Sequence, residues 1–202
     1  NIITKKASKS YGKASMAFGS NQSRDAKAIY SIKDGKTGVY LSAGKAKQGY
    51  AKYKDVSDKA TKRWPRTSNF DSDKVSLKIA QEMNDSANIE VGYDYSQYDG
   101  FSSGSLFNTY GNSKNKKRTN NIYTKVNWTL NEDNDGYLQI YHNEFKYTSN
   151  RETDNYLYGD IDEKTTGIDL QQAIKTSDTN RVVVGASWHK STIDNAQDSY
   201  LG

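Results

Sequence analysis

The feature that most constrains this chain is the stretch Lys74–Gln97, where apolar and polar residues alternate on either side of a short turn. Alternation with a period of two is the signature of a half-buried β-strand, because successive side chains point to opposite faces. The central Asn84–Ser86 segment favours a tight turn. The stretch therefore predicts a β-hairpin with one apolar and one polar face. The apolar set is Val75, Leu77, Ile79, Ala87, Ile89, Val91, Tyr93 and Tyr95.

The strands of this hairpin are longer than the five or six residues common in soluble proteins and end in tyrosines. Strands of about 9–11 residues flanked by aromatics are typical of outer-membrane β-barrels. The low mean hydropathy of −0.97 is compatible with such a barrel, which needs only every second residue to be apolar. The longest aliphatic run, Val182–Val184, is too short for a transmembrane helix.

Composition agrees with a barrel and excludes little else. The 16 tyrosines suit membrane interfaces, and the single proline suits uninterrupted strand pairing. The absence of cysteine excludes disulfides and thiolate metal sites. A net charge of +5 is ordinary for a solvated surface, and we expect no nucleic-acid partner.

Alternation predicts further strands within 12–19, 26–32, 39–43, 122–130, 136–147, 168–174 and 182–188. The facing of 136–147 stays open, because Leu138 and Ile140 compete with Tyr141, Phe145 and Tyr147. Short turns are predicted near 21, 34, 84, 133 and 178, and long polar connections at 48–69, 99–118 and 149–163. Short connections at one end and mostly long ones at the other are typical of an outer-membrane barrel. A soluble up-and-down barrel or jelly roll is the alternative.

Nine strands would leave two open edges, and an unpaired edge is not tolerated in hydrocarbon. Bacterial barrels also have even strand numbers. The predicted fold class is therefore all-β, an antiparallel up-and-down transmembrane β-barrel, with about nine strands forming the N-terminal part of a larger barrel.

The opening Asn1–Lys6, of sequence NIITKK, resembles the end of the plug domain of TonB-dependent outer-membrane receptors, and the following hairpins are similar to the family's first nine strands. The resemblance implies that residues 1–9 end a plug and that 10–202 belong to a 22-stranded barrel, with the chain a fragment. It implies uptake of a scarce metal chelate, cobalamin or a siderophore or haem, across the bacterial outer membrane. Its implied partners are a TonB-type energy-coupling protein, the chelate, lipopolysaccharide and the rest of the barrel. It implies no enzymatic activity and no required cofactor.

Within this family the chain is most similar to the cobalamin (vitamin B12) receptors. The likeness lies in Gly19–Asn21, in Asp71–Asp73 and in Gln97–Asp99 with the following 104–108. It implies a calcium site of loop oxygens, a ligand type that calcium prefers, although aspartate is also a common turn residue. Asn108 replaces an expected aspartate, and another is absent after Gly49–Tyr50. The implied calcium ligands are Asp71, Asp73, Asp99 and Asn108.

Four aromatic residues of the predicted outer loops are candidates for binding the transported ligand: Tyr50, Trp64, Tyr98 and Phe101. Trp128 and Trp188, near predicted strand ends, are expected at the membrane interface. The basic run 114–118 is interpreted as an outer rim that contacts lipopolysaccharide phosphates rather than nucleic acid.

Two other functions stay open. An outer-membrane protease or lipase would need a carboxylate–His or Ser–His pair, and His189 is the candidate; otherwise His189 and His142 are expected to be structural. An adhesin or phage-docking surface could use the same loops.

Overall fold

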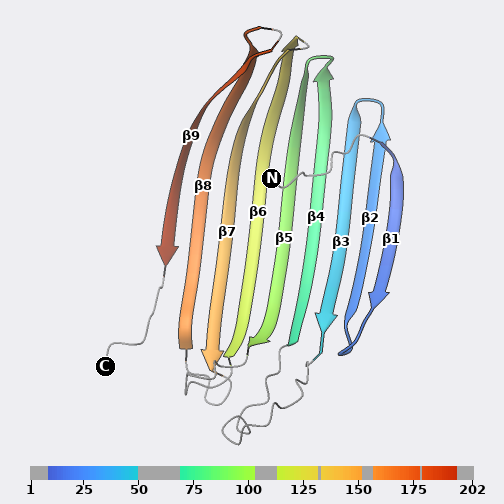
Figure 1. The fold of residues 1–202 in the computed structure, drawn as a ribbon, viewed down its shortest axis with the longest axis vertical. Coiled ribbons are helices and arrows are strands. Elements are labelled where there is room, and N and C mark those ends of the chain that lie inside the picture. Colours follow the sequence, from blue (N-terminus) through green and yellow to red (C-terminus); the bar gives the residue numbers. More distant parts are fainter. Residues whose placement is uncertain are drawn as a thin grey trace, which may run out of the picture.

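The computed structural model describes residues 9–49, 69–102, 113–131, 133–151, 157–177 and 179–194, and these residues form nine β-strands (Figure 1). The strands form one antiparallel sheet in which each pairs with its neighbours in the chain. The all-β, up-and-down prediction is confirmed. Within the described residues the sheet is open, with β1 and β9 at its edges. The strands are β1 (Tyr11–Phe18), β2 (Arg24–Asp34), β3 (Thr37–Gln48), β4 (Asn69–Asn84), β5 (Ala87–Ser102), β6 (Ser113–Asn131), β7 (Asn134–Arg151), β8 (Leu157–Lys175) and β9 (Arg181–Asp194).

The described part of the chain contains no helix that is long and apolar enough to cross a membrane.

The predicted short turns are confirmed, and most of them gather at one end of the sheet (Figure 1). The β2–β3 and β4–β5 turns have two residues each. Gly35 has a φ of 51°, the left-handed conformation that the predicted Asp-Gly turn requires. At the opposite end, Asn21 and Gln22 take φ values of 55° and 57° in the brief β1–β2 turn.

The prediction of long polar connections is wrong in its boundaries, because the strands extend well into them. β5 continues to Ser102 and β6 starts at Ser113, so only 103–112 joins them instead of 99–118. β7 and β8 likewise reduce the predicted 149–163 connection to 152–156. In these stretches both faces of the strands carry polar residues, so alternation gives no signal, yet the backbone pairing continues in unbroken register over most of their length.

The pairing register assigns every residue to one of two faces, because directly paired residues in antiparallel strands share a face. It also decides the facing of β7, which the sequence left open. Ile140 pairs between Thr124 and Ile168 on the apolar face, and Tyr141 pairs between Tyr123 and Gly167 on the polar face. One apolar row runs Ile32, Val39, Ile79, Val91, Thr124, Ile140, Ile168 and Trp188.

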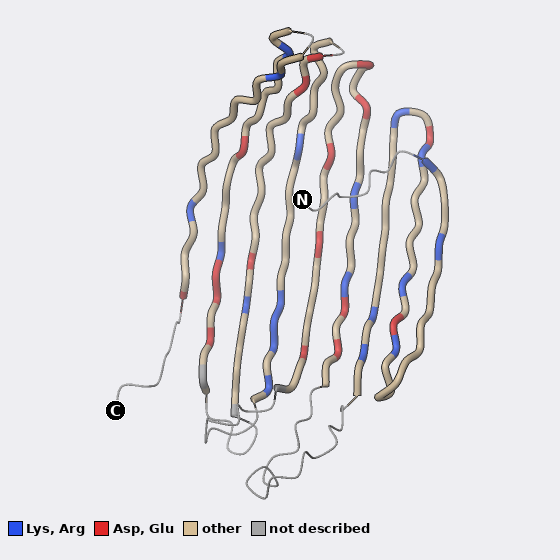
Figure 2. Tube along the Cα trace, viewed as in Figure 1, with Lys and Arg blue, Asp and Glu red and all other residues tan. Residues whose placement is uncertain are grey.

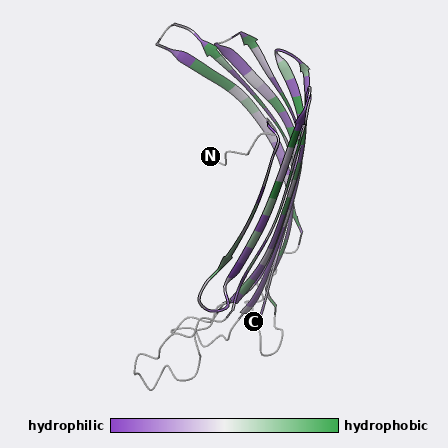
Figure 3. Ribbon diagram, turned by 90° about the vertical axis from the view of Figure 1, so that its right-hand side faces the viewer, coloured by the Kyte–Doolittle hydropathy of each residue, from purple (hydrophilic) through white to green (hydrophobic). Residues whose placement is uncertain are grey.

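The sheet is bent when seen from its edge (Figure 3). Side chains converge on the concave side of a bent sheet, and the buried residues Ser31, Tyr40, Lys78 and Tyr123, with exposures of 1–8%, all belong to the polar set. The apolar set is exposed, as Leu41 at 45% and Val184 at 52% illustrate. We therefore assign the polar set to the concave face and the apolar set to the convex face.

Tyrosine rings cover glycines on the concave face. A Cβ atom at Gly92 would lie 2.3 Å from the ring of its cross-strand partner Tyr123, and one at Gly167 would lie 2.4 Å from its partner Tyr141. The Tyr123 hydroxyl donates a hydrogen bond of 2.7 Å to Glu90. In such pairs the aromatic ring packs on the backbone of the glycine, which has no side chain to cover it. This packing stabilises one strand register over the alternatives.

The apolar residues of the convex face form a band that crosses the strands obliquely. In β1 the apolar run 14–18 is centred on Met16, and in β9 the run 182–188 is centred on Gly185. The chain of directly paired residues that starts at Met16 in β1 reaches Asp194 in β9 after eight interstrand steps. The centre of the band in β9 is at 185, so the band is displaced along the strands by nine residues between β1 and β9. At about 3.3 Å per residue and 4.8 Å per strand, the band is inclined to the pairing direction by about 38°.

Candidate functional site

The candidate site is a groove of about 580 Å³ on the sheet, close to the end with the long connections. Two register rows supply most of it, Ser72–Tyr98–Lys117–Tyr147 and Lys74–Ser96–Thr119–Phe145, and both lie on the concave face. Four adjacent strands therefore build one surface, mostly from alternate residues. The groove is lined by Ser72, Lys74, Ser96, Gln97, Tyr98, Ser113, Asn115, Lys117, Thr119, Phe145, Tyr147 and Ser149.

The groove combines aromatic rings with hydroxyl groups and positive charge. Two lysines and no carboxylate occur among its described lining residues. The Lys117 ammonium lies 5.6 Å from the centre of the Tyr147 ring, and the Tyr147 hydroxyl donates a hydrogen bond of 3.0 Å to the Asn115 amide oxygen. Such a surface suits an anionic ligand with flat rings, because rings stack on aromatic faces and ammonium groups pair with anions.

Tyr98 is a predicted ligand-binding residue that the structure places in the groove. It is 36% exposed, and its ring stacks on Phe70 at 5.8 Å between centres. Phe101 does not join it, because it lies on the convex face opposite Asn69 and is only 8% exposed. The other two candidates, Tyr50 and Trp64, lie outside the described residues.

The sequence reasoning missed Lys74, Lys117, Phe145 and Tyr147 as groove residues. A signal existed for Lys117. It is an odd number of positions from Ile122, which fixes it on the opposite face once β6 is continued through the basic run.

The predicted calcium ligands are only partly brought together. Asp71 and Asp99 pair directly across β4 and β5, and each has one buried carboxylate oxygen. The Lys45 ammonium lies 3.3 Å from the Asp71 carboxylate and 3.2 Å from the Asp73 carboxylate. These two predicted calcium ligands are therefore already paired with a positive charge. The hydrogen bonds to Asp73 and Asp71 raise the pKa of Lys45.

Calcium takes six to eight oxygen ligands. The described residues contain no cluster of three acidic or histidine side chains arranged to hold a metal, and Asn108 lies outside them. Asp71 and Asp99 fit the edge of such a site, and calcium binding stays a prediction.

The two histidines lie on opposite faces. His189 on β9 pairs with Gly167 on the concave face. His142 on the convex face contacts the Thr166 hydroxyl at 2.7 Å and lies 3.8 Å from the Glu144 carboxylate. The contact with Thr166 could not be predicted from local sequence, because Thr166 comes from the next strand. The separation of His142 from Glu144 exceeds hydrogen-bond length, so the carboxylate does not orient the imidazole as a catalytic base requires.

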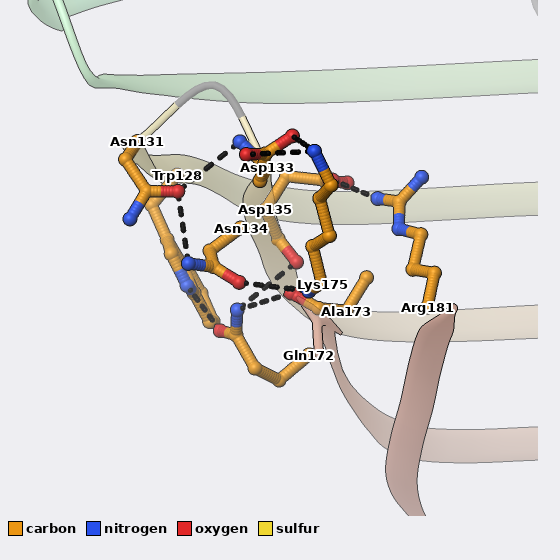
Figure 4. Close-up of polar contacts among 9 residues, drawn as sticks. All are labelled: Trp128, Asn131, Asp133, Asn134, Asp135, Gln172, Ala173, Lys175 and Arg181. Atoms are coloured by element: carbon orange, nitrogen blue, oxygen red, sulfur yellow. Dashed lines mark hydrogen bonds and ion pairs between the residues drawn. The ribbon is translucent and has the colours of Figure 1, made fainter. Parts of the chain in front are cut away.

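A second polar cluster ties the β6–β7 and β8–β9 hairpins together at the short-turn end (Figure 4). The Trp128 indole N–H donates to the Gln172 side chain at 2.8 Å, reaching across Gly136 between them. Lys175 pairs with Asp133, and Arg181 pairs with Asp135. The contacts are mutually satisfied, so this cluster fixes the hairpin tips and offers no unpaired charge to a ligand. Trp188, by contrast, lies in the middle of β9 and not near a strand end as predicted.

A comparison of the sequence with protein-family models and with curated proteins finds no match.

Proposed function

We propose that this sheet is part of the wall of a transmembrane β-barrel in the bacterial outer membrane, and that the barrel is a TonB-dependent transporter for a scarce metal chelate. The observation that carries the proposal is the oblique apolar band. A membrane is flat, so tilted strands must each present their apolar residues at a different position along their length. The inclination of about 38° falls within the 35–45° tilt of outer-membrane barrels.

A soluble sandwich explains this surface less well. The apolar rows of a sandwich face a second sheet, and aligned sheets differ in strand direction by only about 30°. Within the described residues no second layer covers the convex face, and Leu77, Val91 and Ile140 remain 38–50% exposed on it. An exposed apolar face of this kind is suited to contact with lipid. A closed barrel of 22 strands, as the family resemblance implies, would also pair the edges of β1 and β9.

The concave face supports transport. It is lined by hydroxyl, amide and charged groups, as the lumen of a barrel is. The groove of Lys74, Tyr98, Lys117 and Tyr147 lies at the long-connection end, which in such barrels faces outside the cell. We propose that the chelate is captured there. A plug upstream, of which Asn1–Lys6 would be the end, would then admit it when driven by the energy-coupling protein.

Cysteine scanning tests the barrel. These 202 residues contain no cysteine, so Leu77→Cys and Ser76→Cys each add one reactive site to them, on neighbouring positions of β4. In the full-length protein reconstituted in lipid, a fluorophore at 77 should be quenched by brominated acyl chains. One at 76 should be quenched by a water-soluble reagent instead. Equal responses at the two positions would show that the faces do not separate lipid from water.

Ligand binding tests the transporter. The full-length protein is titrated with cobalamin, with ferric siderophores of different charge and with haem. For the chelate that binds, Lys117→Gln should weaken the affinity about ten-fold, the effect of losing one charge-assisted contact. Lys13→Gln is the matched control, since it removes a lysine from the same concave face outside the groove. Failure of every chelate to bind would rule out the transporter while leaving the barrel intact.

A further inference from the structure

Three basic side chains on β6 form a line along the convex face. Lys114, Lys116 and Arg118 occupy alternate positions of the strand, and all three are exposed. They pair across the sheet with Phe101, Asp99 and Gln97, so they share the face of the apolar band. We call these three residues the basic column. Figure 2 shows it as the run of positive positions near the lower end of β6, together with Lys117, whose side chain belongs to the other face.

The basic column makes no salt bridge with another described residue. The nearest carboxylate in register, Asp99, accepts a hydrogen bond of 2.8 Å from Gln97 instead. One other cation at this level is neutralised, because Lys45 pairs with Asp71 and Asp73. The column is therefore a local excess of positive charge.

Like charges also face each other at this level of the convex face. Arg118 pairs in register with Lys146, and Arg24 pairs with Lys47. Like charges directly opposite on one face destabilise a sheet unless an anion lies between them. Lys146 has Asp162 at 2.6 Å, but Arg118 and Arg24 have no such partner among the described residues, and Lys47 faces Asp71 in register without an ion pair to it. This arrangement favours an external anion.

The column begins just beyond the apolar band. On β6 the band ends at Ile122, and Arg118 lies four residues before it in the chain, with Asn120 between them. Four residues rise about 13 Å along the strand, or about 10 Å along the membrane normal at the tilt derived above. Long cationic side chains can reach back toward the interface from there. Arg118 thus lies at the depth of lipid head groups, and Lys116 and Lys114 continue the charge outward.

We propose that the basic column binds the phosphate groups of membrane lipids, and that β6 thereby anchors this side of the sheet at a fixed depth. The inference rests on the proposed membrane barrel, in which the convex face meets lipid. It also gives the consecutive residues 116–118 two separate tasks. Lys116 and Arg118 face lipid phosphate, and Lys117 faces the groove.

The test uses the full-length protein in detergent, titrated with phosphatidylglycerol and followed by native mass spectrometry. Each cation near an anionic surface contributes about five-fold in affinity, roughly 1 kcal/mol. Lys114→Gln/Lys116→Gln/Arg118→Gln should therefore bind the lipid about 100-fold more weakly than the parent. Lys13→Gln removes a charge from the concave face, outside the groove, and should bind this lipid as the parent does. Phosphatidylcholine should bind the parent and the triple variant equally.

Two further arms separate the possible failures. Inorganic phosphate alone should not displace the lipid at matched concentration; if it does, the column is a phosphate site and not a lipid site. Quenching of Trp188 by brominated lipid tests whether the convex face contacts lipid, and this measurement does not depend on the basic column. If Trp188 is quenched but the triple variant binds phosphatidylglycerol normally, the basic column proposal is overturned and the barrel stands. If Trp188 is not quenched, both are overturned.

Discussion

Replacement of Gly92 by alanine is the most direct probe of how the concave face is built. A methyl group at this position would lie 2.3 Å from the Cε1 and Cζ atoms of Tyr123 and 2.6 Å from its hydroxyl. The neighbour is a ring that is 8% exposed, so it cannot swing freely away. The ring must tilt off the sheet, and its 2.7 Å hydrogen bond to Glu90 must lengthen or break.

The expected cost follows from these contacts. Forcing an extra methyl into a packed site costs about 1–3 kcal/mol. Loss of a hydrogen bond to a charged group adds about 1.5 kcal/mol at the low end of its range, which suits a partly exposed pair. Alanine recovers about 0.5–1 kcal/mol of the backbone entropy that glycine loses on folding. The net prediction is destabilisation by about 1.5–4 kcal/mol.

Urea unfolding of the full-length protein in lipid vesicles, followed by tryptophan fluorescence, measures this cost. Gly44→Ala is the matched control, because Gly44 lies on the same face and its added Cβ would meet atoms no closer than 3.6 Å. It should be neutral within about 0.5 kcal/mol or slightly stabilising. A double-mutant cycle with Tyr123→Ala then isolates the contact, because Gly92→Ala should cost nothing once the ring is absent.

The reasoning would be refuted by a Gly92→Ala cost below about 0.5 kcal/mol. It would equally be refuted if Gly92→Ala cost the same with and without the Tyr123 ring, because the penalty would then come from the backbone and not from the ring.

Three further predictions follow from polar contacts. The hydrogen bond between Lys146 and Asp162 raises the pKa of the ammonium group and lowers that of the carboxyl, outside the apolar band. Because the folded-state pKa of Asp162 is lowered, the ion pair stabilises the protein at pH values above the ordinary aspartate pKa of about 3.9, and this stabilisation is lost as the pH falls through the folded-state pKa. Asp162→Asn should therefore make the melting temperature less sensitive to acid. A melting temperature with the same pH profile in parent and variant would contradict this. Trp128→Phe removes the indole donor to Gln172 and should cost about 1 kcal/mol in urea unfolding, whereas no loss would indicate that water replaces the bond. If calcium binds beside Asp99, a chelator should lower the melting temperature of the parent but not of Asp99→Asn.

Alternation was sufficient to predict the strands where one face is apolar. Val91 and Ile79, for example, were assigned to the correct face, and they pair directly. It failed where both faces are polar, because a strand of lysine, asparagine and threonine has no period that hydropathy can detect. Residues 113–118 are strand only because the backbone of β5 and β7 pairs with them on both sides.

The groove was harder to predict than the strands for a related reason. Its residues come from β4 to β7. Predicting that they lie together requires the exact pairing register at the three interfaces between these strands. A shift of one residue would move Lys117 to the convex face and Lys116 into the groove. The contact of His142 with Thr166 is likewise set by register and not by local sequence.

Every strand in this sheet pairs only with the strands before and after it in the chain (Figure 1). A two-strand unit could therefore be duplicated or deleted during evolution without changing the partners of the units that remain. If the sheet closes into the proposed barrel, the barrel can grow in circumference by strand pairs, so lumen diameter and loop repertoire can diverge between descendants while each hairpin keeps its own local pairing.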